Sequence, residues 1–269
     1  MLMDVDAYLH RIGYDGPREP TAETLRRLHR AHMVAVPFEN LDIPMGRPII
    51  LSLPLIFDKI VGRGRGGFCY ELNGLFGWLL EALGFPVTKY SARVFGGDEP
   101  GPEFDHMLLR VDLGQPFLAD VGFGDSFIEP LPFNHEEHVQ GDRAYRLVEQ
   151  DETWVLQQRK PASEWASQCV FSLTPRRFEE YAPMCHYQQT SPESSFTKKS
   201  VCSRATPAGR ITLSNDRLIV TTDGHREETN IVDEAAYRAL LKTHFGFELD
   251  DEAPVDRLMD LTLPAKTQS

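Results

Sequence analysis

The stretch Arg65-Gly66-Gly67-Phe68-Cys69-Tyr70-Glu71-Leu72-Asn73 places a cysteine at the predicted start of a helix. Apolar residues follow with the i, i+3, i+4, i+7 spacing of an amphipathic helix, at Leu72, Leu75, Phe76, Leu79, Leu80 and Leu83. Gly84 and Pro86 then predict the end of that helix. The partial positive charge of a helix N-terminus stabilises a thiolate, and the nearby cation of Arg65 would do the same. Cys69 is therefore a candidate nucleophile, although free cysteines are more commonly small buried hydrophobes.

The composition is that of an ordinary globular protein with an acidic balance. The 269 residues suffice for one large domain or for two to three small ones. A formal charge of -12 argues against nucleic acid or an anionic membrane as the main partner. No apolar run reaches the roughly 18 residues of a membrane span, and we find no secretory signal pattern. Widely spread cysteines without a CxxC pair indicate reduced thiols, so we expect a cytoplasmic protein.

The first 84 residues are predicted to form a small helical bundle. We expect a short helix from Val5 to Gly13, a second capped by Thr21, a third capped by Ser52 and a fourth after Cys69. Some of these helices carry histidines with polar neighbours, which we expect at the solvated surface: His10, His29 and His32.

From Val87 onward the apolar period changes from 3.6 to 2, which predicts strands. We expect a small antiparallel sheet or barrel with strands at Val87–Phe95, Met107–Val111, Phe117–Val121, Tyr145–Glu149, Thr153–Gln158 and Gln168–Leu173. Residues 174–200 are polar and contain three prolines, so an irregular linker or covering segment is predicted there. Two more strands follow at Arg210–Leu213 and Leu218–Thr222, and a last helix at Glu234–Phe245.

His106 and Asp120 are the best-placed partners for a cysteine nucleophile, which needs an imidazole within reach and a third group to orient that ring. His106 opens one apolar strand, and Asp120 directly follows the next. The short connection between these strands predicts that they pair, so that their ends meet at one sheet edge. A turn-capping role for Asp120 is the alternative at this point.

Further stretches form an ordered set along the chain: Tyr8-Leu9-His10-Arg11-Ile12-Gly13-Tyr14, Pro37-Phe38-Glu39-Asn40-Leu41-Asp42, His106-Met107, Asp120-Val121-Gly122-Phe123-Gly124, and Ser191-Pro192 with Ser195-Phe196. Together with the cysteine stretch, and in this order, they resemble the motifs of the arylamine N-acetyltransferases. The resemblance covers almost the whole chain, and a set of ordered motifs is far more specific than any single one.

The resemblance implies an α+β fold with a cysteine-protease-like catalytic core in three domains. It places a helical bundle carrying the nucleophilic cysteine at residues 1–84 and a β-barrel carrying the histidine and the aspartate at 85–185. A linker and an α/β lid would occupy residues 186–269. It also implies a catalytic triad of Cys69, His106 and Asp120.

The implied reaction is a ping-pong transfer of acetyl from acetyl-CoA, as co-substrate, through a thioester on Cys69. The acceptors would be arylamines, arylhydrazines or N-hydroxyarylamines, as in xenobiotic metabolism. No metal is expected: neither Cys185-His186 nor His135-Glu136-Glu137-His138 has the usual spacing of metal ligands. The oligomeric state is left open.

Other positions match family residues with supporting roles. The resemblance implies that Phe38, Phe123, Gly124 and Phe196 border the acceptor and CoA cleft, although a lone phenylalanine is usually core. It implies that Arg11, Glu39 and Arg65 brace the loop behind Cys69. Asp105 departs from the pattern, because many members have a small or hydroxyl residue before the histidine, and this carboxylate could perturb His106.

Three alternatives stay open at this point. A cysteine hydrolase or a transglutaminase-like amide transferase shares the Cys–His–Asp order and differs in its acyl donor. An amide synthase of polyketide macrocycle closure would need a carrier protein. A non-enzymatic binding module would leave the three polar residues without a role. A dinucleotide site at Gly62–Gly67 is not expected, because that glycine pattern follows a predicted helix rather than a strand.

Overall fold

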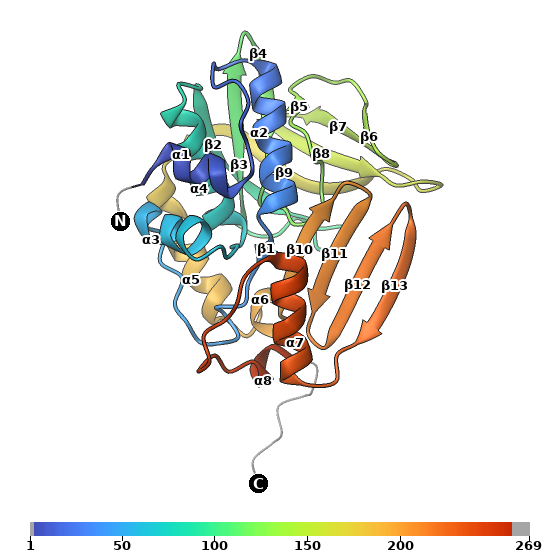
Figure 1. Ribbon diagram of the computed structural model, residues 1–269. Coiled ribbons are helices and arrows are strands. Elements are labelled where there is room, and N and C mark those ends of the chain that lie inside the picture. The colour runs from blue at the N-terminus through green and yellow to red at the C-terminus, as the bar shows by residue number, and fades with distance from the viewer. Residues whose placement is uncertain (1–2, 260–269) are drawn as a thin grey trace.

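The computed structural model describes residues 3–259 (Figure 1). Four helices precede the first long strand, as the sequence predicts: α1 (Val5–Arg11), α2 (Ala22–Ala35), α3 (Leu53–Phe57) and α4 (Cys69–Ala82). Thr21 caps α2, since its hydroxyl accepts a hydrogen bond from the Thr24 amide. Ser52 occupies the N-cap position of α3 without a side-chain hydrogen bond, and a π-helical turn, Asp58–Gly62, continues that helix.

Helix α4 lies at the centre of the largest apolar cluster. Its inward residues pack with α1, α2 and α3 on one side and with side chains of the neighbouring sheet, such as Leu109 and Phe117, on the other. The helix ends at Ala82 with Leu83 as its C-cap, and Gly84 follows with φ +86°, a left-handed conformation that glycine adopts without strain. Because the helix is surrounded by protein, ten of its apolar and polar residues besides Cys69 are buried.

Eight antiparallel strands form a barrel-like sheet in the order β5-β4-β3-β2-β9-β8-β7-β6. Their bounds are β2 (Val87–Val94), β3 (His106–Leu113), β4 (Gln115–Ala119), β5 (Leu131–Pro132), β6 (His138–Gln140), β7 (Arg143–Gln150), β8 (Thr153–Arg159) and β9 (Ala166–Arg176). The register between β3 and β4 pairs Leu109 with Ala119. His106 at the start of β3 and Asp120 just after β4 therefore reach the same sheet edge, as predicted.

The second sheet has five antiparallel strands in the order β1-β10-β11-β12-β13 and lies below the first in Figure 1. Its strands are β1 (Phe38–Glu39), β10 (Val201–Thr206), β11 (Gly209–Ser214), β12 (Arg217–Thr222) and β13 (His225–Asn230). Helix α7 (Glu234–Leu240) continues into a π-helical turn, Leu241–Phe245, and α8 (Asp256–Met259) follows. Their apolar residues pack with Leu213 and Cys202 of this sheet.

Contacts cross the predicted limits of the three segments. Strand β1 lies in the first segment but pairs with β10 of the third, with Phe38 opposite Ser203 and Glu39 opposite Cys202. The division into units 1–84, 85–185 and 186–269 stays a prediction.

The prediction of an irregular segment over residues 174–200 is wrong. Strand β9 extends to Arg176, a 3-10 turn covers Phe178–Tyr181, and two helices follow, α5 (Ala182–Thr190) and α6 (Ser195–Lys198). Helix α5 has only two buried residues, so no apolar period announces it, and Pro183 lies in its first turn, where proline is tolerated. Strands β10 and β13 were also not predicted; every residue of β13 is exposed, so its side chains show no alternation.

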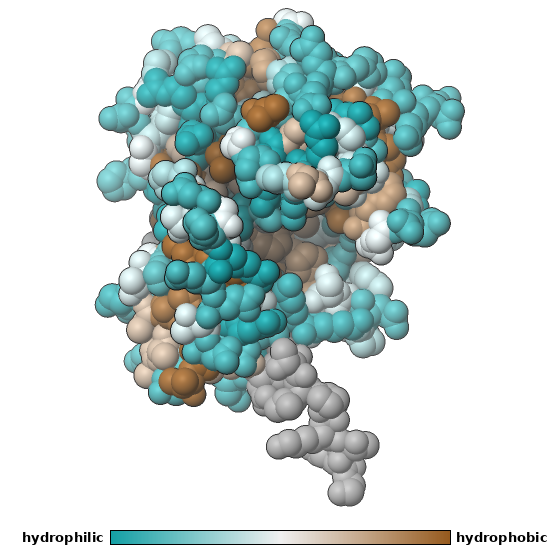
Figure 2. All heavy atoms as spheres, turned by 90° about the vertical axis from the view of Figure 1, so that its right-hand side faces the viewer, coloured by the Kyte–Doolittle hydropathy of each residue, from teal (hydrophilic) through white to brown (hydrophobic). Residues whose placement is uncertain are grey.

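The face drawn in Figure 2 is largely hydrophilic; apolar residues are scattered over it in small groups and are also seen in the recess between the upper and lower halves of the view. None of the helices over residues 3–259 combines the length and the apolarity that a bilayer-spanning segment needs.

The position of α4 predicts a large cost for truncating its core face. We expect Phe76→Ala, at a fully buried position, to lower the free energy of unfolding by about 3–5 kcal/mol. Leu55→Ala is the control, because Leu55 is 54% exposed, and should change it by less than about 0.5 kcal/mol. Urea unfolding followed by circular dichroism measures both; equal losses would contradict the central position of α4.

Candidate active site

Cys69 is the first residue of α4, as the sequence predicts, and only 3% of it is exposed. The turn before it needs its two glycines. A Cβ on Gly66 would lie 2.0 Å from the carbonyl oxygen of Pro37, and a Cβ on Gly67 would lie 2.7 Å from Glu71 Cβ. Glu71 in turn accepts a hydrogen bond from the Phe68 amide at 3.1 Å, which satisfies one free donor of the helix end. The cysteine is thus fixed by its neighbours in the chain.

His106 and Asp120 form a buried pair. His106 Nε2 lies 2.8 Å from Asp120 Oδ2, and the two residues are 3% and 0% exposed. Because Nε2 faces the carboxylate, Nδ1 is the ring nitrogen that remains for another partner. The second carboxylate oxygen, Oδ1, accepts from the Gly122 amide at 2.9 Å. The ring of Phe123 packs edge-on against the imidazole, with 5.1 Å between centroids.

Asn73 connects this pair to the cysteine helix. It lies one turn after Cys69 on α4, and its Nδ2 donates to Asp120 Oδ1 at 2.8 Å and to the Met107 carbonyl at 2.7 Å. Its Oδ1 accepts from the Val121 amide at 2.9 Å. The segment after Asp120 also contacts the cysteine directly, because a Cβ on Gly122 would lie 2.8 Å from Cys69 Cα.

Tyr70 adds a tie between α4 and the segment before β3. Its hydroxyl donates to the carbonyl oxygens of Phe104 and Asp105, at 2.7 and 3.2 Å. The structure therefore brings the helix that begins with Cys69, the strand that begins with His106 and the loop that contains Asp120 into one site. Neither Asn73 nor Tyr70 was assigned a role from the sequence, although both lie in the cysteine stretch.

His29 and His32 are not at the surface, so that prediction is wrong. Both are 0% exposed. His29 Nε2 accepts a hydrogen bond from the Asp120 amide at 3.1 Å, and Nδ1 lies 2.7 Å from the Ile128 carbonyl oxygen. His32 Nδ1 lies 2.8 Å from the Tyr8 hydroxyl. Their polar sequence neighbours face solvent on the other side of α2, and the face that carries the two histidines is covered by α1, α4 and the loop after β4.

The surroundings of Cys69 favour the neutral thiol. Burial raises the pKa of Cys69 well above its usual range, and the carboxylates of Asp105 and Asp120 add to that effect. Asp105 is held by Gln188 Nε2, 2.7 Å from its Oδ1. Arg65 does not stabilise the thiolate as the sequence predicts, because its guanidinium is bound by Glu39 and Asp42. A thiolate at Cys69 therefore requires a proton acceptor and cation close by.

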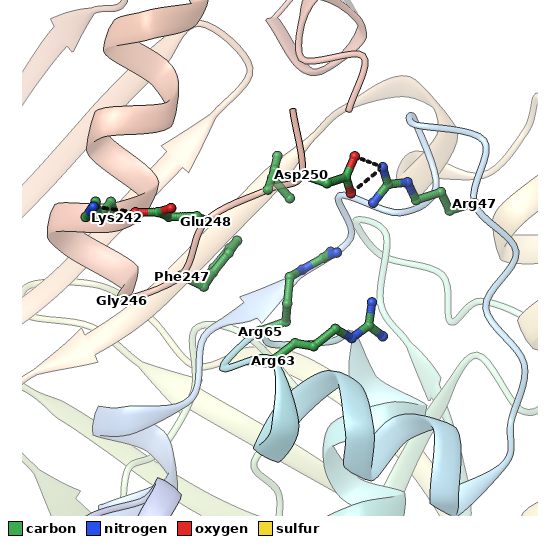
Figure 3. Close-up of a pocket in the computed structure, with 9 residues that line it drawn as sticks. Arg47, Arg63, Arg65, Lys242, Gly246, Phe247, Glu248 and Asp250 are labelled. Atoms are coloured by element: carbon green, nitrogen blue, oxygen red, sulfur yellow. Dashed lines mark hydrogen bonds and ion pairs between the residues drawn. The ribbon is translucent and has the colours of Figure 1, made fainter. Parts of the chain in front are cut away.

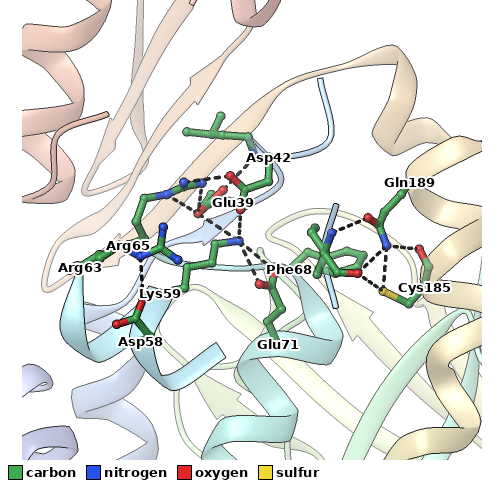
Figure 4. A network of polar contacts seen from close by, with 12 residues as sticks. Glu39, Asp42, Asp58, Lys59, Arg63, Arg65, Phe68, Glu71, Cys185 and Gln189 are labelled. Carbon is green, nitrogen blue, oxygen red and sulfur yellow. Dashed lines mark hydrogen bonds and ion pairs between the residues drawn. The ribbon is translucent and has the colours of Figure 1, made fainter. Parts of the chain in front are cut away.

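A buried ion network lies behind the cysteine turn (Figure 4). Arg65 binds Glu39 at 2.7 Å and Asp42 at 2.9 Å, and Lys59 Nζ lies 2.7 Å from Asp42 and 2.9 Å from Glu71. Burial alone would raise the pKa of Asp42, but the charges of Lys59 and Arg65 outweigh it and lower that pKa to about 2. Burial raises the pKa of Glu71. Lys59, Asp42 and Glu71 were not recognised from the sequence as members of this network.

Arg11 supports the same turn in another way. Its guanidinium donates to four main-chain carbonyl oxygens, of Ile60, Ala35, Gly64 and Arg65, at 2.8 to 3.3 Å. It binds no carboxylate of the ion network. Arg11 is thus joined to the turn before Cys69 through the backbone, whereas Glu39 and Arg65 are joined through a charge pair.

The three aromatic residues expected at the cleft are half-buried, and two of them, Phe38 and Phe196, lie close together. Phe196 packs against Phe38 with 6.3 Å between ring centroids and edge-on against Phe68 with 5.7 Å. A Cβ on Gly124 would lie 3.5 Å from the Phe38 ring. Asn40 Nδ2 donates to the Phe196 carbonyl oxygen at 3.0 Å and thereby holds that segment next to β1.

A cavity of about 560 Å³ lies between the turn before Cys69, which contributes Arg63 and Arg65, and residues 246–250 (Figure 3). Arg47, Arg63 and Lys242 line it, each with a carboxylate partner: Asp250, Asp58 and Glu248. The charges around this cavity are therefore paired. Within residues 3–259 no cluster of three His, Cys, Asp or Glu side chains has an arrangement suited to a metal ion.

Known proteins resemble this chain over nearly its full length. A family model described as N-acetyltransferase matches residues 21–254. Arylamine N-acetyltransferase 2 of Mesocricetus auratus is 34% identical over 278 residues, covering 92% of this chain and 95% of that protein. The M. smegmatis arylamine N-acetyltransferase structure superimposes with a TM-score of 0.89 at 32% identity, over 96% and 100% of the two chains. The Mycobacterium marinum enzyme in complex with CoA gives 0.86 at 32% identity, over 96% and 98%.

The ion network predicts that Lys59 is needed for stability. Lys59→Met leaves three buried carboxylates with only Arg65, so we expect a loss of about 3–5 kcal/mol in the free energy of unfolding. Adding Glu71→Gln should restore part of it, because one unpaired charge is removed. Lys242→Met, at an exposed pair, should leave the melting temperature unchanged. Thermal and urea unfolding measure the stability of each variant. Equal losses of stability for Lys59→Met and Lys242→Met would contradict the importance of the network.

Burial of neutral His29 predicts a loss of stability on mild acidification. Burial lowers the pKa of His29 to about 4, below the 6.5 of an unfolded chain. The unfolded state therefore binds the proton first, and the stabilising contribution falls as the pH drops below about 6.5. Between about pH 7.5 and pH 5 we expect the wild type to lose about 2 kcal/mol more than His29→Gln, which lacks this titration. Urea unfolding measures both proteins. Equal losses in the free energy of unfolding for wild type and His29→Gln would show that His29 is already protonated or exposed.

Proposed function

This chain belongs to the arylamine N-acetyltransferase family, and on that premise we propose that Cys69, His106 and Asp120 are its catalytic triad. One observation carries the proposal: the Asp120 carboxylate binds His106 at 2.8 Å and is bound by Asn73, which lies one turn after Cys69 on the same helix. The close approach of Gly122 to the Cys69 backbone and the hydrogen bonds of Tyr70 give further support. With Nε2 bound to Asp120, Nδ1 is the ring nitrogen left for the Cys69 thiol, and in this proposal it is the atom that receives the thiol proton.

In the first half-reaction, His106 Nδ1 takes the proton of the Cys69 thiol, and the thiolate attacks the acetyl carbonyl of acetyl-CoA. The carbon–sulfur bond to CoA then breaks, and the imidazolium returns its proton to the leaving thiolate. The products are free CoA and an acetyl thioester on Cys69. One thioester replaces another, so the step needs no external energy source.

In the second half-reaction, an arylamine attacks the thioester of Cys69 with its neutral amino group. His106 accepts the proton of the amine nitrogen and passes it to the Cys69 sulfur as the thioester breaks. The products are the N-acetylated arylamine and the free thiol. Arylhydrazines and N-hydroxyarylamines carry the same kind of weakly basic nitrogen and are proposed as acceptors too.

The electrostatics of the site fit this sequence of proton transfers. Because burial raises the pKa of the thiol, the proton leaves Cys69 only when a base receives it directly. The resulting imidazolium is stabilised by the Asp120 carboxylate, whose other oxygen is held by Asn73 and the Gly122 amide. The thiolate and imidazolium then stabilise each other as a buried ion pair.

Phe38, Phe123, Gly124 and Phe196 are proposed to border the cleft for the acceptor and the acyl donor. The rings are half-buried, and Phe123 packs against the catalytic imidazole, so they offer apolar surface next to the reacting atoms. The solved Mycobacterium marinum relative contains CoA, which supports acetyl-CoA as the donor here. Arg11, Glu39 and Arg65 are proposed as structural support for the turn before Cys69.

Three coarser assignments accompany this function. Residues 1–84, 85–185 and 186–269 are proposed as the helical, barrel and lid domains. All four cysteines are buried and free, which supports a reducing, cytoplasmic location. No nucleic acid or membrane partner is proposed, because the formal charge is -12.

Two-substrate kinetics test the function. Initial rates measured with acetyl-CoA and a simple arylamine such as 4-methoxyaniline, both varied, should give parallel double-reciprocal lines, because CoA leaves before the amine binds. Cys69→Ser should lose nearly all activity, and Cys202→Ser, at a buried cysteine outside the site, is the control. Lines that intersect would contradict the acetyl-enzyme, and activity retained by Cys69→Ser would contradict the nucleophile.

A further inference from the structure

His29 is a fully buried histidine that contacts the main chain of Asp120 rather than its carboxylate. It lies in α2, far from Asp120 in the sequence, and its Nε2 lies 3.1 Å from the Asp120 amide nitrogen. Its Nδ1 lies 2.7 Å from the carbonyl oxygen of Ile128. A carbonyl oxygen only accepts hydrogen bonds and an amide only donates, so Nδ1 carries the proton and Nε2 is the acceptor. The two partners together determine a single neutral tautomer.

The ring is held in this orientation by packing. Phe127 stacks on it, with 5.7 Å between centroids and 20° between planes, and Phe76 packs edge-on at 5.9 Å. Phe127 belongs to the loop after Asp120, and Phe76 belongs to α4. The imidazole thus lies between the helix that carries Cys69 and the loop that carries Asp120, and rotation of the ring would break both hydrogen bonds.

The Asp120 amide needs such a partner because the sheet does not supply one. Strand β4 ends at Ala119, which is the last residue paired with β3 on that side. Asp120 follows directly, and its amide would otherwise be a buried donor without an acceptor, which is costly. The acceptor is a side chain from α2, so the position of the Asp120 backbone depends on a residue outside the sheet.

We propose that His29 is a positioning residue for acetyl transfer: its neutral imidazole accepts the Asp120 N–H and so holds the Asp120 carboxylate where it orients His106. This inference rests on the proposed triad. Asn73 and the Gly122 amide fix one oxygen of the carboxylate, and His29 fixes the main chain from which the side chain extends. His29 touches neither substrate nor reacting atoms, so its effect is expected in the chemical steps rather than in substrate binding.

Two substitutions separate the hydrogen bonds of His29. The amide of glutamine reaches the place of Nε2, so His29→Gln keeps an acceptor for the Asp120 N–H and loses the bond to Ile128. The amide of asparagine reaches the place of Nδ1, so His29→Asn keeps the donor for Ile128 and leaves the Asp120 N–H unpaired. Both variants lose the ring and one hydrogen bond, which matches them in their expected effect on stability.

Activity should distinguish the two variants. We expect His29→Asn to lower kcat by about 10- to 100-fold with little change in KM, because a small displacement of a catalytic group costs that much. His29→Gln should stay within about 3-fold of the wild type, and so should His10→Gln at an exposed histidine. Equal kcat values for His29→Gln and His29→Asn, whether both lowered or both unchanged, would overturn the positioning role. A raised KM with an unchanged kcat would also overturn the positioning role.

A spectroscopic measurement on the wild type tests the hydrogen bond without a variant. In protein labelled with ¹⁵N-histidine, the two-bond proton–nitrogen correlations of His29 should show a protonated Nδ1 and an unprotonated Nε2 at neutral pH. A ring protonated on Nε2 would overturn the proposal, since it could not accept the Asp120 N–H. A wild type that transfers no acetyl group would contradict the proposed function instead, and the tautomer would still be decided.

Discussion

Two buried cations hold the part of the chain on which the site depends. Lys59 and Arg65 bind three carboxylates, of Glu39, Asp42 and Glu71, and all five residues are buried. These residues come from the segment around β1, from the π-helical turn, from the glycine turn and from the first turn of α4. Removal of one cation would leave uncompensated buried charge, so the four segments are fixed relative to one another. Because Glu71 also accepts the Phe68 amide, the network fixes the helix start at which Cys69 lies.

The residues of the proposed triad are brought together by the sheet and by α4. The strand register brings His106 and Asp120 to one sheet edge, and Asn73 joins that edge to α4 one turn after Cys69. The ion network does not supply charge to the sulfur, since both cations are neutralised within it. Because burial raises the pKa of the thiol, the proposed mechanism relies on the His106–Asp120 pair to ionise it. The charges of the ion network are thus separate from the charges proposed to act in catalysis.

The sequence predicted the parts of the fold and site that have a local signal. The apolar period of α4, the glycines before Cys69 and the alternating strands around His106 and Asp120 each arise within a few residues, and the structure has these elements where they were expected. The family resemblance, which rests on the order of the motifs, added the implied triad of Cys69, His106 and Asp120. Arg65 was identified as a supporting residue, but its cation was wrongly expected to act on the thiol, because the carboxylates that neutralise it come from a distant segment.

What the sequence did not predict depends on contacts between segments far apart. His29 has polar neighbours in the chain, and only the packing of α2 against α4 and the loop after β4 makes it a buried acceptor for Asp120. Helix α5 is held by polar contacts, such as those of Gln189 with the backbone of Ile49, and therefore lacks an apolar period. The roles of Asn73 and Lys59 could not be predicted, because they depend on partners that no local sequence pattern identifies.

The most direct test of the account is the mass of the intact protein after brief mixing with acetyl-CoA and no acceptor. Wild type should gain the mass of one acetyl group, Cys69→Ala should gain none, and an added arylamine should return the wild type to its original mass. Such an adduct would show that Cys69 is the sulfur on which both half-reactions occur. A wild type without an adduct, or an adduct that persists in Cys69→Ala, would contradict the proposed mechanism at its first step.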